Sequence, residues 1–189
     1  KVGDVCDVKT GGTPSRNKQS YWGGNIKWMS SGEIHNRFIH DTTEKITDAG
    51  VRNSNARLLP KDTVFIAMNG QGKTRGTVAI SKCELTCNQS LAALISNREK
   101  LLPEFLYFYL RTQYQNIRNL TGEGRNGLNL KLVKSIPIPL IDIEKQEDIS
   151  KFLSGIAEQS RLLEKKREQL TAIKMNTIMS YLEGQHDRI

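Results

Sequence analysis

The chain has 189 residues, 37% of them hydrophobic, which suffices for one ordinary globular core. It contains no run of eighteen apolar residues, which excludes a membrane-spanning helix of the usual length. The formal net charge of +8 favours a polyanionic partner, and nucleic acid is the first candidate.

The cysteine content indicates a reducing compartment. Cys6, Cys83 and Cys87 are an odd number without the spacing of a disulfide framework, so we expect a cytoplasmic protein. The chain begins with Lys1 rather than Met and has no apolar signal region there. We therefore expect it to be part of a longer or processed polypeptide.

The first sixty residues show short segments of different character. Lys1–Val8 alternates apolar and polar residues, as a short extended segment does. Lys9–Lys18 has no hydrophobic residue and is rich in turn formers. Ile26–Met29 has the composition of a strand, whereas residues 41–57 are polar with a faint helical period.

Regular structure is predicted more clearly after residue 60. A helix is expected from Pro103 to Asn116, with the proline in the first turn, where its missing N–H is not needed. The two prolines of Ile136–Leu140 keep their preceding residues extended, so this segment is predicted to be a hinge. The strands are expected at Thr63–Met68, Gly76–Ile80 and Leu91–Ile95.

The last quarter has the sequence of a long helix with an apolar seam. Residues 145–189 contain no proline and are rich in good helix formers. Apolar residues recur every seven positions, a spacing that predicts a coiled coil. Gln159 and Lys166 interrupt the seam, and the alternative is a long surface helix packed on its own domain. The predicted seam residues are Ile149, Phe152, Leu153, Ile156, Leu163, Leu170 and Ile173.

These elements predict an α+β protein with two parts. Residues 1–141 are expected to form a mostly β globular domain, and residues 142–189 a long C-terminal coiled-coil helix. Residues 1–141 hold 20 Lys and Arg against 11 Asp and Glu, whereas residues 142–189 hold 8 against 9. The basic domain therefore suits nucleic acid, and the nearly neutral helix suits protein contacts.

Two cysteines and two histidines raise the alternative of a zinc site. Cys83 and Cys87 with His35 and His40 supply suitable ligand atoms, but the pairs lack zinc-finger spacing and lie in β-like sequence. Buried thiols are the simpler interpretation. We predict neither a metal nor a cofactor.

The segment Ala67–Thr74 matches a relaxed phosphate-binding loop that ends in Gly-Lys-Thr. Such a loop needs a helix directly after its lysine, because the helix N-terminus faces the phosphate. Here a strand sequence follows, so we predict no nucleotide hydrolysis. No other catalytic motif is recognisable, and the chain is interpreted as a binding protein.

Three polar loops are better suited to DNA. Their lysines and arginines can meet phosphates or guanine edges, and their asparagines and glutamine can bond adenine edges. Each loop alone is equally well a solvated turn, but three of them in a basic domain predict nucleic-acid binding. Trp22 and Trp28 are predicted to pack in the protein rather than to stack on bases. The candidate side chains in these loops are Arg16, Lys18, Asn69, Gln71, Lys73, Arg75, Arg125 and Asn126.

A series of short motifs covers nearly the whole chain. They are Gly11–Arg16, Tyr21–Trp28, Ser31–Ile34, Thr47–Gly50, Asn53–Pro60, Arg75–Gly76, Asn88–Gln89, Leu128–Leu130, Ile136–Leu140 and Gln146–Ile149. Together they resemble the target recognition domain, and the start of the following helix, in the specificity subunit of type I restriction-modification systems. The resemblance adds to the DNA-binding candidates Thr13, Ser15, Tyr21, Ser31, Asn88 and Gln89.

The resemblance implies a non-catalytic subunit that recognises one half of a bipartite double-stranded DNA site. Modification subunits, which supply S-adenosylmethionine and methylate adenine, would dock on it, and restriction subunits would join through the complex. The family's subunit usually has two recognition domains and two antiparallel helices. One domain with one helix is therefore expected to form an antiparallel homodimer. The alternative is the recognition part of a single-chain restriction enzyme or methyltransferase.

Overall fold

The structure, a computed structural model, describes residues 1–70, 72–121 and 127–186. The chain divides into two compact units, Lys1–Glu147 and Asp148–Ile189. The predicted α+β class is confirmed, since a sheet-rich unit is followed by a long helix.

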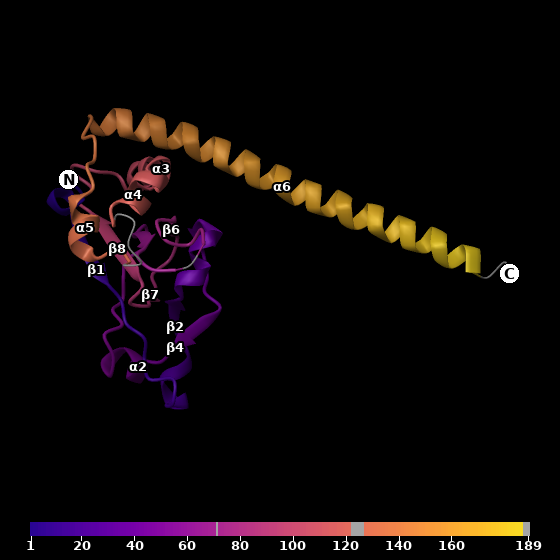
Figure 1. The fold of residues 1–189 in the computed structure, drawn as a ribbon, viewed down its shortest axis with the longest axis horizontal. Coiled ribbons are helices and arrows are strands. Elements are labelled where there is room, and N and C mark those ends of the chain that lie inside the picture. The colour runs from indigo at the N-terminus through magenta and orange to yellow at the C-terminus, as the bar shows by residue number, and fades with distance from the viewer. Residues whose placement is uncertain (71, 122–126, 187–189) are drawn as a thin grey trace. The chain divides into compact units, whose positions relative to one another are not determined.

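A five-stranded sheet forms the centre of the first unit (Figure 1). Neighbouring strands are antiparallel, except that β3 pairs parallel with β6. All of β5 and the first four residues of β8 are buried, which explains their continuous apolar sequence. The three predicted strands are present as β5, β6 and β8. The order across the sheet is β1 (Cys6–Thr10), β8 (Leu91–Ser96), β5 (Val64–Ala67), β6 (Val78–Ser81) and β3 (Phe38–Ile39).

A smaller sheet has the order β4 (Glu44–Ile46), β2 (Trp22–Met29) and β7 (Thr86–Cys87). Trp28 is buried and meets the Trp22 ring edge to face, with ring centroids 5.1 Å apart, so the packing role predicted for these tryptophans is confirmed.

The structure of residues 41–57 follows the faint helical period of their sequence only in part, because strand β4 occupies some of this segment. The helix that does form there, α2 (Asp48–Arg52), is short. It begins where the Thr47 hydroxyl accepts a hydrogen bond from the Gly50 N–H at 3.1 Å, the usual N-cap arrangement.

Short helices complete the first unit. The helix expected from Pro103 to Asn116 is interrupted at Gln113 and forms α3 and α4. The segment expected to be extended at the N-terminus starts instead with a helical turn, in which the backbone α-ammonium group of Lys1 lies 2.9 Å from the Asp4 carboxylate. The helices are α1 (Val2–Val5), η1 (Gln19–Tyr21), η2 (Ser31–Asn36), α3 (Pro103–Thr112), α4 (Tyr114–Asn119) and α5 (Leu130–Ser135).

Helix α5 was not predicted, because its six residues are too few to show a helical period. It is started by Asn129, whose side-chain oxygen accepts a hydrogen bond from the Leu132 N–H at 3.0 Å. Helix α3 packs on the five-stranded sheet. The residues that it buries are Pro103, Phe105, Leu106, Tyr107, Phe108 and Leu110.

The long helix α6 spans Ile143–His186, so its 44 residues extend for about 66 Å. The side chain of Gln146, in its first turn, is fully buried. Its Nε2 donates to the carbonyl oxygens of Lys100 at 3.0 Å and Ile141 at 2.8 Å, and its Oε1 accepts from the Leu102 N–H at 2.9 Å. This one glutamine therefore ties the start of α6 to the segment after β8.

Beyond that turn α6 exposes apolar side chains. Six of the seven predicted seam residues are between 39% and 70% exposed, and Leu153 is half-buried. Other large apolar side chains of the helix are exposed as well, among them Leu162, Met175, Ile178, Met179 and Tyr181. A long helix with this much exposed apolar surface is typical of a protein-binding element. Among the described residues, no helix has the length and hydropathy needed to cross a membrane.

Candidate nucleic-acid interface

Two of the three polar loops predicted from the sequence, those after β1 and β5, leave the five-stranded sheet at one end. Strand pairing places Thr10, the last residue of β1, opposite Ala92, and Ala67, the last residue of β5, opposite Leu91. The loops that follow β1 and β5 and the one that precedes β8 therefore start side by side. The segment after residue 126 returns to this end, because the Leu128 N–H donates to the Met68 carbonyl oxygen at 2.8 Å.

Hydrogen bonds hold the loop before β8 against the loop after β1. The Thr10 hydroxyl lies 3.1 Å from the carbonyl oxygens of both Gln89 and Leu91. The Thr13 hydroxyl donates to Gln89 Oε1 at 2.6 Å. The side chain of Asn88 is oriented by the backbone two residues further on, since its Oδ1 accepts a hydrogen bond from the Ser90 N–H at 3.1 Å. The amides of Asn88 and Gln89 are thus presented at the sheet end.

A hollow of about 290 Å³ opens beside these amides, and its lining is polar but uncharged. Asn88 lies near it and donates to the Ser31 hydroxyl at 3.5 Å. Groups of this kind can pair with base edges, because amides and hydroxyls offer both donors and acceptors. The lining residues are Gly11, Gly12, Thr13, Asn53, Ser54, Asn55 and Gln89.

The two glycines of this hollow have a packing role. A Cβ on Gly11 would lie 1.8 Å from the Cys87 carbonyl oxygen, and one on Gly12 would lie 2.5 Å from the Asn55 carbonyl carbon. The Gly12 carbonyl also accepts a hydrogen bond from Trp28 Nε1 at 2.9 Å. The Gly-Gly motif therefore lets three backbone segments approach closely.

Arg16 is occupied within the protein, which argues against its predicted role as a DNA contact. Its guanidinium forms a forked ion pair with Glu44, in which Nη2 lies 2.9 Å from Oε2. The same group stacks over the Trp22 ring, 3.7 Å from its centroid. The hydrogen bond from Arg16 lowers the pKa of the Glu44 carboxyl. Arg16 thus stabilises the smaller sheet.

The prediction that Tyr21 contacts DNA is also corrected, because this residue is only 8% exposed and its hydroxyl lies 3.3 Å from Lys18 Nζ. We assign it to the core. Lys18 and Ser15 are exposed, and so is Asn69, whose Oδ1 would lie 1.7 Å from a Cβ on Gly127. Arg75 is half-buried and engaged by other groups. Gln71, Arg125 and Asn126 lie outside the described residues.

The loop that carries Lys73 joins two antiparallel strands, β5 and β6, so no helix follows it as in a phosphate-binding loop. Two residues of α4, Tyr114 and Arg118, hold it, and we call this pair the α4 clamp. Arg118 Nη1 donates to the Gly72 carbonyl at 2.6 Å and to the Tyr114 hydroxyl at 2.7 Å. The Tyr114 hydroxyl in turn donates to the Lys73 carbonyl at 3.0 Å.

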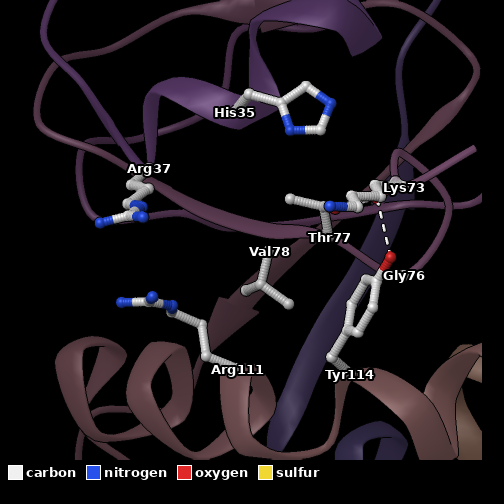
Figure 2. A pocket seen from close by; sticks show the side chains of 8 residues that line it. All are labelled: His35, Arg37, Lys73, Gly76, Thr77, Val78, Arg111 and Tyr114. Carbon is white, nitrogen blue, oxygen red and sulfur yellow. Dashed lines mark hydrogen bonds between the residues drawn. The ribbon is translucent and has the colours of Figure 1, made fainter.

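A second, basic hollow of about 530 Å³ lies next to this loop (Figure 2). It combines a histidine, a lysine and two arginines, and no Asp or Glu is among its lining residues. The sequence did not single out Arg37 or Arg111, because the cations of this hollow lie far apart along the chain. The lining residues are His35, Arg37, Lys73, Gly76, Thr77, Val78, Arg111 and Tyr114.

The zinc alternative finds no support in the described part of the chain, where no three His, Cys, Asp or Glu side chains are grouped to hold a metal ion. Burial raises the thiol pKa of Cys6 and of Cys87 to about 12. Cys83 Sγ contacts the Ile39 carbonyl at 3.6 Å, and His35 Nε2 lies 3.2 Å from the Thr74 hydroxyl.

Comparison with known proteins gives consistent matches. The family model of the type I restriction modification DNA specificity domain matches residues 1–172. The chain is 30% identical over 176 residues to the type I restriction enzyme MjaIX specificity subunit of Methanocaldococcus jannaschii, and the match covers 89% of this chain and 39% of that protein. It is 26% identical over 157 residues to the EcoR124I/EcoR124II specificity subunit of Escherichia coli, covering 80% and 39%.

The fold is similar to that of a solved type I restriction-modification system S subunit from M. genitalium. The TM-score is 0.68 at 18% identity, and the match covers 91% of this chain and 42% of that one. The chain therefore spans about two fifths of the length of the relatives it matches.

Proposed function

The chain belongs to the family of type I restriction-modification DNA specificity domains, and from this we propose that residues 1–141 recognise a sequence in double-stranded DNA. The observation that carries the proposal is the convergence, at one end of the five-stranded sheet, of the loops after β1 and β5 and the loop before β8. Since the chain spans about two fifths of its relatives, it would read one half of a bipartite site.

The side chains at this end are suited to two kinds of contact. Asn69, Asn88 and Gln89 carry amides that can bond base edges, whereas Lys73 carries a charge that can meet a phosphate. The backbone of the Lys73 loop is held by the α4 clamp, which limits the entropy lost on binding. The further side chains that we propose for this interface are Thr13, Ser15, Lys18, Ser31, Gln71, Arg75, Arg125 and Asn126.

For α6 we propose pairing with a second long helix. Its exposed apolar seam would be covered in this way, and each buried aliphatic side chain would contribute about 1.5–3 kcal/mol. Two copies of this chain would form a two-fold, antiparallel homodimer, because closed two-fold pairing is the commonest arrangement of identical chains. The two basic domains would then face half-sites about one DNA turn, or ~34 Å, apart.

The proposed partners are the modification subunits of a type I system, with restriction subunits joining through the complex. In this proposal the chain has no catalytic role and resides in the cytoplasm. A single-chain restriction enzyme or methyltransferase is not favoured, since the matched relatives are specificity subunits.

Selection from a randomised duplex library tests this function. The full chain is expected to enrich one short sequence. An Asn69→Ala, Gln89→Ala variant is expected to lose about 1–3 kcal/mol of discrimination per disrupted base contact and to relax the sequence there. A matched control, Asn116→Ala on the exposed surface of α4, is expected to enrich the original sequence. Enrichment of no sequence by the unmodified chain contradicts the proposal.

A further inference from the structure

The basic hollow has a chemistry distinct from that of the amide-lined sheet end. We propose that Arg37 and Arg111 bind a backbone phosphate of duplex DNA in this hollow, adding affinity without reading bases. The inference rests on the proposed function, of which it specifies one part: the anchoring of the duplex beside the base-reading loops.

The first argument is the convergence of like charges. Arg37 follows η2, Lys73 lies in the loop between β5 and β6, and Arg111 lies near the end of α3. Figure 2 shows the side chains of Arg37 and Arg111 extending into the same open space. Because no Asp or Glu is among the lining residues, the repulsion between these cations is not offset there by a carboxylate. An anion would offset it.

The second argument is the backbone of Arg37. Its φ of 63° and ψ of −60° lie in a region that residues other than glycine rarely adopt. Two hydrogen bonds hold it there: its N–H donates to the Ile34 carbonyl at 3.3 Å, and its carbonyl accepts from the Ile80 N–H at 2.8 Å. Backbone strain that the fold maintains is concentrated at functional sites, and here it directs an arginine into the hollow.

The third argument is the support of Arg111. Its Nη1 donates to the hydroxyl of the buried Tyr107 at 3.4 Å, and its guanidinium lies 5.6 Å from the centroid of that ring. Burial raises the pKa of Tyr107, so the phenol stays neutral and does not cancel the positive charge. The one carboxylate of α3, Glu104, is paired with Lys82 at 2.8 Å.

Phosphate is the ligand that we infer, because several positive side chains and no carboxylate line one hollow. Guanidinium groups bind phosphate oxygens through forked pairs of hydrogen bonds. Gly76 and Thr77, the last residues of the Lys73 loop, line the hollow. If the bases of one DNA strand contact that loop, the phosphate backbone of the same DNA strand would pass along the hollow.

The test uses the full chain, a fluorescent 30-base-pair duplex of random sequence, and anisotropy titrations between 50 and 200 mM KCl. The Arg37→Gln, Arg111→Gln variant is expected to bind about 10–100-fold more weakly. The slope of its log affinity against log salt concentration is expected to be smaller by about 0.9, the value for one lost phosphate contact. Its preferred sequence in a library selection is expected to be unchanged. Arg111→Gln alone, on a regular helix, is expected to weaken duplex binding and lower the salt slope in the same direction, by less than the double variant does.

The control is Lys61→Gln, Lys100→Gln, which removes two exposed charges at the opposite end of the sheet. The proposal is overturned if the Arg37→Gln, Arg111→Gln variant has the same salt slope as the control. It is also overturned if this variant binds DNA normally but no longer binds a modification subunit, because the ligand of the hollow would then be an acidic protein surface. The two proposals can fail separately. If the unmodified chain binds duplex but enriches no sequence, and the double variant still has the smaller salt slope, the phosphate site is supported and sequence recognition is contradicted. Binding of no duplex contradicts both.

Discussion

Arg118 donates a hydrogen bond to the carbonyl oxygen of Gly72, 2.6 Å away, although 46 positions separate the two residues. Gly76, in the same loop, packs so closely on this arginine that a Cβ there would lie 2.9 Å from Arg118 Cγ. A residue of a surface helix therefore determines the path of the loop that carries Lys73.

Arg118→Ala is expected to loosen this loop. Loss of the bond to Gly72 leaves a carbonyl without its donor, and we expect the free energy of unfolding to fall by about 1 kcal/mol. Amide hydrogen exchange should accelerate in the residues after Gly72 and leave β8 unchanged. Lys131→Ala, an exposed change on α5, serves as the control. Equal exchange in the two variants would mean that the α4 clamp does not hold the loop.

Gly11→Ala is expected to destabilise the first unit strongly. The added methyl group would lie 1.8 Å from the Cys87 carbonyl, so the backbone must shift, and we expect a loss of about 3 kcal/mol or more in urea unfolding. Gly155→Ala is the matched change, because nothing lies within 4 Å of its added Cβ. There we expect α6 to gain ~0.5–1 kcal/mol from helix propensity. Similar stabilities of the two variants would contradict the packing argument.

Asp62 is expected to make stability depend on acid pH. Burial opposes its ionisation, but hydrogen bonds from Arg98 and Lys82, at 3.0 and 3.2 Å, hold its pKa below the ordinary 3.8. Because the folded-state pKa is the lower one, the stabilisation is present above pH ~4 and is lost as the pH falls through the folded-state pKa.

Asp62→Asn checks this dependence, since asparagine tolerates the φ of 66° at this position. The difference in unfolding free energy between the unmodified chain and the variant should shrink between pH 5 and pH 2.5. A difference that stays constant over this range would show that ionisation of Asp62 does not stabilise the fold.

The homodimer proposed for α6 is checked by light scattering at tens of micromolar. Leu163→Glu is expected to yield monomers, because it places a charge in the apolar seam. Lys165→Gln changes the net charge equally, lies off the seam, and should leave the dimer intact. A monomeric unmodified chain would exclude pairing.

The orientation of the two helices needs a separate measurement. A spin label at Ser154 should report a label-to-label distance well above the ~10 Å between adjacent helix axes, as an antiparallel pair requires. A distance near that value would indicate a parallel pair.

Local sequence was sufficient for the elements whose pattern is local. The apolar runs at β5, β6 and β8 predicted strands because burial on both faces demands apolar residues at successive positions. The seven-residue repeat predicted α6 because helix periodicity is likewise a property of neighbouring residues. The family motifs pointed to the fold for the same reason: each is a short run readable by itself.

The tertiary structure alone decided what each polar side chain contacts. Arg16 looked like a DNA contact until Glu44, from a different strand, was found to occupy its guanidinium. Arg37 and Arg111 had no local signal, since the pairing of β3 with β6 and the packing of α3 on the sheet bring them to one hollow. The charge of a side chain follows from its residue type and is known from the sequence. Whether that charge is neutralised depends on residues distant in sequence that become its neighbours only when the chain folds.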